Sequence, residues 1–186
     1  ALDLAVQKLL EAKKPVFYVG GGVVTSNASD ELLEVAEILQ MPVTPTLMGL
    51  GGFPSVHENC MGMLGMHGTY TSNMAVAESD LLFAVGVRFD DRVTGKLATF
   101  APHAEVIHID ISPSNIGKIR KANISLVADA KTALKAIAEK LKNRSQSDIS
   151  ASIKRREPWW REIRERQKSV PLICETSETE IKPQQV

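Results

Sequence analysis

The fold is decided by residues 81–95, which read LLFAVGVRFDDRVTG, together with residues 106–110, which read VIHID. Each stretch is a short apolar run that ends in charged residues, and the first of them also ends in glycine. An unbroken apolar run of this length is typical of a strand covered on both faces, as in a parallel sheet. In such sheets ligands bind just beyond the carboxyl ends of the strands. The pattern therefore predicts an α/β fold that binds a nucleotide-like ligand beside these charged residues.

Outward from this stretch, apolar β-branched runs alternate with segments of helical spacing. Helices are expected at residues 2–12, 30–38, 69–78 and 129–141, with one or two helical turns at 113–119. Strands are expected at 15–19, 41–46, 81–85, 105–109 and 124–127, and residues 47–66 are expected to form a loop. This alternation predicts a mostly parallel sheet with crossover helices.

After residue 142 the sequence changes from alternating apolar segments to mostly polar and charged residues. Residues 143–147, NRSQS, read as a polar linker, and the charged stretch around Trp159 and Trp160 predicts a surface helix. We expect both tryptophans to dock on the chain's own domain rather than on a neighbour. The sequence thus divides into a domain at 1–142 and a linker with a helix at 143–186. It reads as a piece of a longer protein, because it starts without Met and closes on a linker-like KPQQV.

The composition is that of a soluble globular protein, with 44% hydrophobic and 24% charged residues among 186. Lys plus Arg and Asp plus Glu both number 22, so the charge offers no argument for nucleic acid or an anionic membrane as a partner. No run approaches the ~20 apolar residues of a membrane helix. The lone Cys60 and Cys174 exclude a disulfide framework or a structural zinc and favour a reducing cytoplasm.

The glycines at 20–22 follow a predicted strand and remove side chains where a ligand would approach the backbone. The helix expected behind them would offer free N–H groups to a phosphate. This is not a GxGxxG fingerprint, because Val24 and Thr25 stand where later glycines are required. A tight turn without any ligand is an equally good interpretation.

Two arginines and an aspartate are the other candidates for ligand contacts. Arg88 and Arg92 flank a pair of aspartates, and a guanidinium can pair with a diphosphate. The alternative is a surface network of Arg–Asp ion pairs. Asp110 has the position of the carboxylate that takes ribose hydroxyls in dinucleotide folds, and the alternative, compatible role is a cap for the turn at 112–114.

No catalytic apparatus is visible in the sequence. The histidines lack metal-ligand spacing, and no Ser or Cys has a nucleophile setting, so neither catalytic nor metal-binding residues are predicted. The methionines within residues 48–66 suit an adaptable lining for a flat aromatic ligand, although core packing explains them as well. The residues by themselves indicate a ligand-binding domain.

Five motifs occur in order over most of residues 1–142, and together they resemble the central domain of acetolactate synthase (acetohydroxyacid synthase) catalytic subunits. They are GGG at 20–22, TLMG at 46–49, LGMHG at 64–68, GVRFDDRVTG at 86–95 and IDISP at 109–113. The resemblance implies a Rossmann-like six-stranded parallel sheet with helices on both faces, and a site for FAD. In that family the flavin does no net redox work in the main reaction.

The resemblance also implies where the activity resides. The complete enzymes decarboxylate pyruvate on thiamine diphosphate and join the two-carbon fragment to pyruvate or 2-oxobutyrate, in branched-chain amino acid biosynthesis. Their catalytic glutamate lies in an N-terminal domain, and their magnesium- and diphosphate-binding motif lies in a C-terminal domain. This fragment is therefore expected to be inactive alone. Its implied partners are those two domains, a second copy in a dimer or tetramer, and a regulatory subunit.

Carried over by motif, the family's cofactor contacts fall on five segments of this sequence. Gly20, Gly21 and Gly22 would approach the ADP part of FAD, while Asp110, Ile111, Asn115 and Asp129 would hold the adenosine end. The flavin and ribityl chain would contact Thr46, Leu47, Met48, Leu64, Gly65, Met66, His67, Gly86, Arg88, Asp90, Arg92 and Val93. Ala128 stands where many family members have glycine. Met66, Asp91 and Arg92 match positions near the family's substrate channel and herbicide site.

Three interpretations are alternatives to the resemblance to acetolactate synthase. Glyoxylate carboligase and pyruvate oxidase have similar central domains that also use FAD, but the DDRVTG run at 90–95 favours the synthase. A sirtuin-type deacylase would need a zinc module with two cysteine pairs, which this sequence lacks. A ligand-free interaction module would use the Trp159–Trp160 helix as its contact surface.

Overall fold

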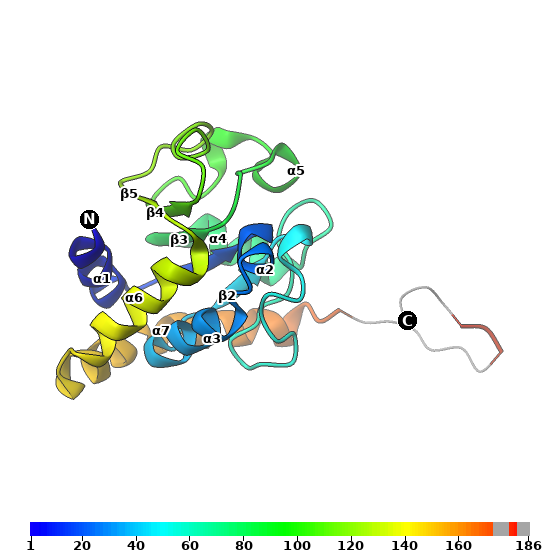
Figure 1. Ribbon diagram of the computed structural model, residues 1–186. Coiled ribbons are helices and arrows are strands. Elements are labelled where there is room, and N and C mark those ends of the chain that lie inside the picture. Colours follow the sequence, from blue (N-terminus) through cyan, green and yellow to red (C-terminus); the bar gives the residue numbers. More distant parts are fainter. Residues whose placement is uncertain (173–178, 182–186) are drawn as a thin grey trace.

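The computed structural model describes residues 1–172 and 179–181, so the predictions for Cys174 and for residues 182–186 lie outside the described residues (Figure 1). Five parallel strands form one sheet in the order β2-β1-β3-β4-β5. They are β1 (Pro15–Val19), β2 (Val43–Pro45), β3 (Leu81–Val85), β4 (Glu105–Asp110) and β5 (Ile124–Val127). Every residue of β1 and β3 is buried, as their continuous apolar sequences predict. The predicted α/β class with a parallel sheet is confirmed.

The prediction of six strands is wrong for the described residues. Beyond β2, Val43 makes one isolated parallel bridge with Cys60, through Val43 N–H to the Asn59 carbonyl (2.8 Å) and Met61 N–H to the Val43 carbonyl (2.9 Å). Gly62 follows with a φ of +83°. Past Gly62, Leu64 N–H still donates to the Pro45 carbonyl (3.3 Å), but Pro45 has no N–H to donate in return, so a longer ladder does not form.

Helices cover both faces of the sheet. One face packs against α1 (Leu2–Glu11), α3 (Ser29–Leu39) and α6 (Ala130–Lys142), and α6 contacts both α1 and α3 (Figure 1). The other face packs against α4 (Tyr70–Glu78) and the second half of α7 (Gln146–Ser169). The remaining helical segments are short: α2 (Gly21–Thr25), η1 (Leu47–Gly49), α5 (Asp91–Thr94) and η2 (Leu97–Thr99).

Two predicted segments differ from the structure. Residues 113–119 form turns without a helix, because Asp110 Oδ1 accepts bonds from Ser112 N–H (2.8 Å) and Asn115 Nδ2 (3.2 Å), and Gly117 has a φ of +73°. Local bonds of this kind compete with helix formation. The expected linker at 143–147 is also shorter, since α7 begins at Gln146, with the hydroxyl of Ser145 accepting a bond from the N–H of Asp148 (3.1 Å).

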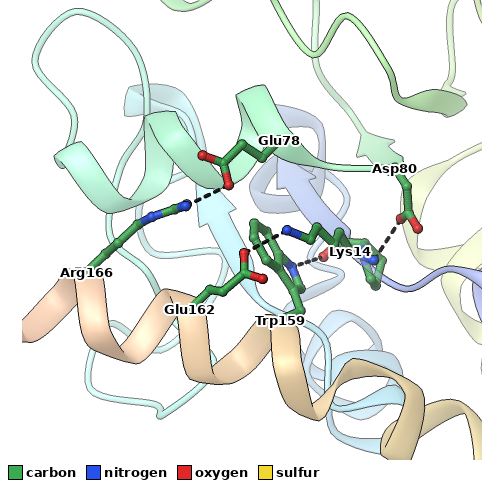
Figure 2. Close-up of polar contacts among 7 residues, drawn as sticks. Lys14, Glu78, Asp80, Trp159, Glu162 and Arg166 are labelled. Atoms are coloured by element: carbon green, nitrogen blue, oxygen red, sulfur yellow. Dashed lines mark hydrogen bonds and ion pairs between the residues drawn. The ribbon is translucent and has the colours of Figure 1, made fainter.

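The helix α7 crosses the amino edge of the sheet. Ile149 belongs to the core on the first face, whereas Trp159 and Ile163 belong to the core on the second. Trp159 is 1% exposed, and its Nε1 donates to the carbonyl of Pro15, the first residue of β1 (3.3 Å). Lys14, next to it, pairs with Glu162 of α7 at 2.7 Å (Figure 2). The prediction that the tryptophan docks on its own domain is confirmed.

Charged pairs continue along the same edge. The carboxylate of Asp80 accepts bonds from the N–H groups of Lys13 (2.7 Å) and Lys14 (2.9 Å), while Arg166 pairs with Glu78 at the end of α4 (2.6 Å; Figure 2). These contacts tie α7 to the segments that lead into β1 and β3. Within the described part of the chain, no helix is both long enough and apolar enough to cross a membrane.

Candidate functional site

A cavity of about 830 Å³ lies at the carboxyl ends of the strands, at the opposite edge of the sheet from α7. Its volume is near the upper end of the range of roughly 300–1,000 Å³ for small-molecule sites. It collects most of the residues predicted to bind a cofactor, namely Gly20, Gly21, Gly22, Thr46, Leu47, Met48, Gly86, Arg88, Asp90, Arg92, Val93, Asp110, Ile111, Asn115 and Asp129. The topology thus brings together segments that are far apart in the sequence.

Bare backbone forms one wall of this cavity. Gly20 N–H donates to the Val85 carbonyl (3.0 Å), and Gly22 N–H donates to the Gly86 carbonyl (3.1 Å). A Cβ atom on Gly22 would lie 2.6 Å from Gly86 Cα, and one on Gly20 would lie 2.1 Å from the Gly86 oxygen. Glycine is therefore required here because the β1–α2 turn touches the end of β3, and the same contact leaves a wall without side chains.

The charged rim of the cavity follows β3. Arg88 pairs with Asp90 at 3.6 Å, and both side chains are largely solvent-exposed. The N–H of Arg92 donates to Asp90 Oδ1 (3.2 Å) at the start of α5. This backbone bond, followed by a bond with the Asp91 side chain, holds the pKa of Asp90 below its usual range. Of the Arg–Asp network considered from the sequence, the structure shows one ion pair, Arg88–Asp90, at the mouth of the cavity.

Asp110 ends β4 and is 7% exposed. Its Oδ1 accepts both the Ser112 N–H and the Asn115 Nδ2 bonds, which confirms that it stabilises the following turn. Because both bonds go to one oxygen, the carboxylate keeps acceptor capacity toward the cavity that it lines.

The segment from Leu64 to His67 does not line the cavity. Leu64 is buried in the core of the second face, whereas Met66 is 66% exposed. Met66 N–H donates to the Arg92 carbonyl (2.9 Å), and the Gly65 N–H donates to the side chain of Asn73 (2.8 Å). The structure thus places Gly65 and Met66 beside Arg92 at the rim, and none of the four predicted residues lines the cavity.

Seven lining residues were not among the predicted site residues: Tyr18, Thr25, Ser26, Val87, Ile109, Ala128 and Ala130. Tyr18 is the most informative, since it is 1% exposed and its ring packs edge-on against Phe89 at 5.3 Å. Burial raises the pKa of Tyr18 above its ordinary value, and the hydroxyl is a hydrogen-bond donor at neutral pH, as for any tyrosine. Its place two residues before Gly20, at the carboxyl end of a strand, was a usable signal.

Across the residues that the structure describes, no cluster of three or more His, Cys, Asp or Glu side chains is arranged to hold a metal ion. What the cavity offers is a bare backbone wall, two arginines, a buried carboxylate and an apolar lining. That combination suits an elongated ligand with an anionic middle and a hydroxyl-bearing end.

Two acetolactate synthase large subunits are similar to this chain over most of its length. The acetolactate synthase isozyme 3 large subunit of Escherichia coli is 46% identical over 182 residues, which cover 98% of this chain and 31% of that protein. The acetolactate synthase large subunit of Corynebacterium glutamicum is 52% identical over 141 residues, or 76% of this chain and 22% of that protein. The chain thus spans less than a third of the length of these relatives.

A solved structure supports the same fold. A protein of Mycobacterium smegmatis, assigned as a thiamin diphosphate-dependent enzyme, matches with a TM-score of 0.62 and 26% identity, over 74% of this chain and 27% of that one. The family model for the central domain of thiamine pyrophosphate enzymes matches residues 2–137. This chain therefore belongs to the thiamine pyrophosphate enzyme family, and the part of that family which it matches is the central domain.

Proposed function

We propose that this chain is the central domain of an acetolactate synthase catalytic subunit and that its cavity holds FAD. The observation that carries the proposal is the cavity at the carboxyl ends of the strands, which unites the residues of four separate family motifs. The large-subunit relatives, 46% and 52% identical, support the choice of synthase over other thiamine enzymes.

The residues present fit this cofactor. The backbone wall at Gly20 and Gly22 admits a diphosphate without steric hindrance from side chains, and Arg88 and Arg92 supply the opposite charge. Asp110 would accept bonds from the ribose hydroxyls of the adenosine end. A bound flavin would supply a redox-capable ring, although the proposed condensation needs no net electron transfer.

The activity proposed for the complete protein is the decarboxylation of pyruvate on thiamine diphosphate, followed by condensation with pyruvate or 2-oxobutyrate. The parts that would bind thiamine diphosphate and Mg²⁺ belong to other domains, so this chain alone is proposed to be inactive. Association with those domains, assembly of the complete protein into a dimer or tetramer, contact with a regulatory subunit and a cytoplasmic location all belong to the same proposal.

The test is a titration of the folded chain with FAD, followed by flavin fluorescence, with NAD as the control ligand. We expect saturable FAD binding that Arg88→Ala weakens by about tenfold, since a charge-assisted contact with a diphosphate is lost. Arg161→Ala is the matched control, because Arg161 is an exposed arginine of α7 at the opposite edge of the sheet.

The outcomes separate the alternatives. Equal losses in the two arginine variants would contradict a diphosphate site at the rim. If the folded chain binds no flavin, the titration is repeated with the complete protein. Flavin binding there would mean that other domains complete the site, whereas its absence would overturn the FAD assignment and favour an interaction module.

A further inference from the structure

The chain leaves the sheet abruptly after β3. Gly86, with a φ of +61°, still donates its N–H to the Ile109 carbonyl (2.8 Å), but the next residues fold back over the second face of the sheet. There Val87 and Phe89 are each 2% exposed. In the described structure no backbone N–H reaches the Val87 carbonyl. A buried carbonyl without a partner destabilises the fold, so this segment needs a donor.

His108 supplies that donor. It lies on β4 with 0% exposure, and its Nε2 is 3.0 Å from the Val87 oxygen. A carbonyl only accepts, so Nε2 must carry the proton. The other ring nitrogen, Nδ1, is buried and has no partner among the described residues. A second proton there would lack an acceptor, so the ring acts as a neutral donor, and burial lowers the pKa of His108 accordingly.

Phe89 makes a second contact with His108, in addition to the bond that His108 makes with Val87. Its ring stands edge-on to the His108 ring at 5.1 Å and edge-on to Tyr18 at 5.3 Å. Its φ of +53° is a conformation that non-glycine residues rarely adopt. The Phe89 ring is buried in the core of the second face. Its neighbours Arg88 and Asp90 have their side chains at the rim of the cavity.

We propose that His108 is a positioning residue for the cavity: its imidazole fixes the Val87 carbonyl, and through it the segment that carries Arg88 and Asp90. The inference rests on the proposed function only for the identity of the ligand. The positioning itself concerns contacts within this chain, so it can be tested whether or not FAD binds.

The experiment compares three substitutions at His108 by backbone amide hydrogen exchange and by FAD titration. His108→Leu removes the donor and nearly keeps the volume. His108→Gln keeps an N–H donor at the place of Nε2, whereas the shorter His108→Asn does not reach it. Trp160→Phe is the control, since it removes a side-chain bond to the Gln40 carbonyl (2.7 Å) at the far edge of the sheet.

We expect His108→Leu and His108→Asn to speed exchange in residues 86–95 about tenfold relative to α6 and to weaken FAD binding by a similar factor. His108→Gln should restore both quantities, and Trp160→Phe should leave exchange in residues 86–95 unchanged relative to α6. If His108→Leu does not fold, the Asn and Gln pair decides the matter.

Equal exchange in residues 86–95 for the Asn and Gln variants would overturn the inference. If the wild-type chain binds no FAD, the titration with the complete protein decides the proposed function, and the exchange measurement on this chain still decides the role of His108. Faster exchange spread evenly over the whole chain would indicate a loss of global stability and would also overturn it.

Discussion

At the scale of single residues, the cavity depends on glycines, whose lack of a Cβ atom lets two backbone segments touch. Gly22 is helical, and in a helix alanine is ordinarily more favourable than glycine by roughly 1 kcal/mol. Here its Cα faces Gly86, and any Cβ would lie 2.6 Å from backbone that cannot rotate away. The clash of a Cβ atom with Gly86 therefore outweighs the helix propensity of alanine at position 22. Glycine is required because two backbone segments are in contact there.

We accordingly predict that Gly22→Ala destabilises the fold by about 2–3 kcal/mol and abolishes ligand binding, because the β1–α2 turn must separate from β3. Gly51→Ala is the control: Gly51 has a φ of +87°, but an added Cβ would meet nothing within 4 Å. That change should cost only about 1 kcal/mol of backbone strain. Urea unfolding measures both variants, and a Gly22→Ala protein as stable as the wild type would contradict the prediction.

Because the imidazole of His108 is buried, we predict that the free energy of unfolding decreases as the pH falls. Burial lowers its pKa below the ordinary 6.5, although the bond to Val87 and the charge of Asp110 oppose the shift. The unfolded chain therefore takes up the proton first as the pH falls. The stability that depends on a neutral His108 is complete above about pH 6.5 and is lost progressively below it, down to the lowered folded pKa.

Urea unfolding between pH 5 and 8 tests this dependence. His108→Gln keeps the hydrogen bond without a titrating group, so its stability should fall less between pH 6.5 and 5 than that of the wild type. An identical slope in the two proteins would show that other groups cause the acid sensitivity.

At the scale of elements, a side chain of α7 caps the carboxyl-terminal ends of two other helices. Arg156 of α7 is 0% exposed and donates to the carbonyls of Leu9 and Ala12 at the end of α1 and of Leu39 at the end of α3. Burial lowers its pKa to about 10, so it remains charged at neutral pH. A cation at a helix carboxyl end also interacts favourably with the helix dipole. One side chain thus satisfies carbonyls from two helices.

We predict that Arg156→Met destabilises the fold by about 3 kcal/mol, because the carbonyls that it contacts lose a charged donor while buried. Arg161→Met, at an exposed position of the same helix, should change stability by no more than about 0.5 kcal/mol. Chemical denaturation followed by circular dichroism compares the two variants. A small effect at both positions would mean that water or neighbouring groups satisfy the carbonyls instead.

At the scale of the whole molecule, we infer that the folding unit extends past the predicted boundary at residue 142. The helix α7 contributes Ile149 to one core and Trp159 and Ile163 to the other. A helix that fills both cores is part of the domain that they stabilise. We infer that the domain ends after Ser169, the last residue of α7.

Truncation tests this boundary. A chain of residues 1–142 should fail to unfold cooperatively, since the loss of a buried tryptophan side chain alone costs about 3–5 kcal/mol. A chain of residues 1–170 should unfold cooperatively at nearly the midpoint of the complete chain. Matching midpoints for the two truncated chains would place the boundary at residue 142 after all.

Much of the fold could be predicted from the sequence because its signals are local. The continuous apolar runs at residues 15–19 and 81–85 predict buried strands by composition, and the alternation with helical segments predicts a parallel sheet. The charged residues after β3 and β4 had to meet at one edge, because parallel strands all end on the same side. The glycines at 20–22 indicated close backbone approach, which is what the structure shows.

Other features depend on contacts between distant segments, and only the tertiary structure decided them. The sixth strand is reduced to a bridge at Cys60, since its length depends on which β2 atoms the loop meets, and Pro45 at the end of β2 has no N–H to extend the ladder. Tyr18 became a cavity residue and His108 an internal donor through neighbours that no local pattern specifies. By itself the sequence determined the class of fold and the edge that carries the site. Packing between remote segments determined the shape of the cavity and which side chains hold it in place.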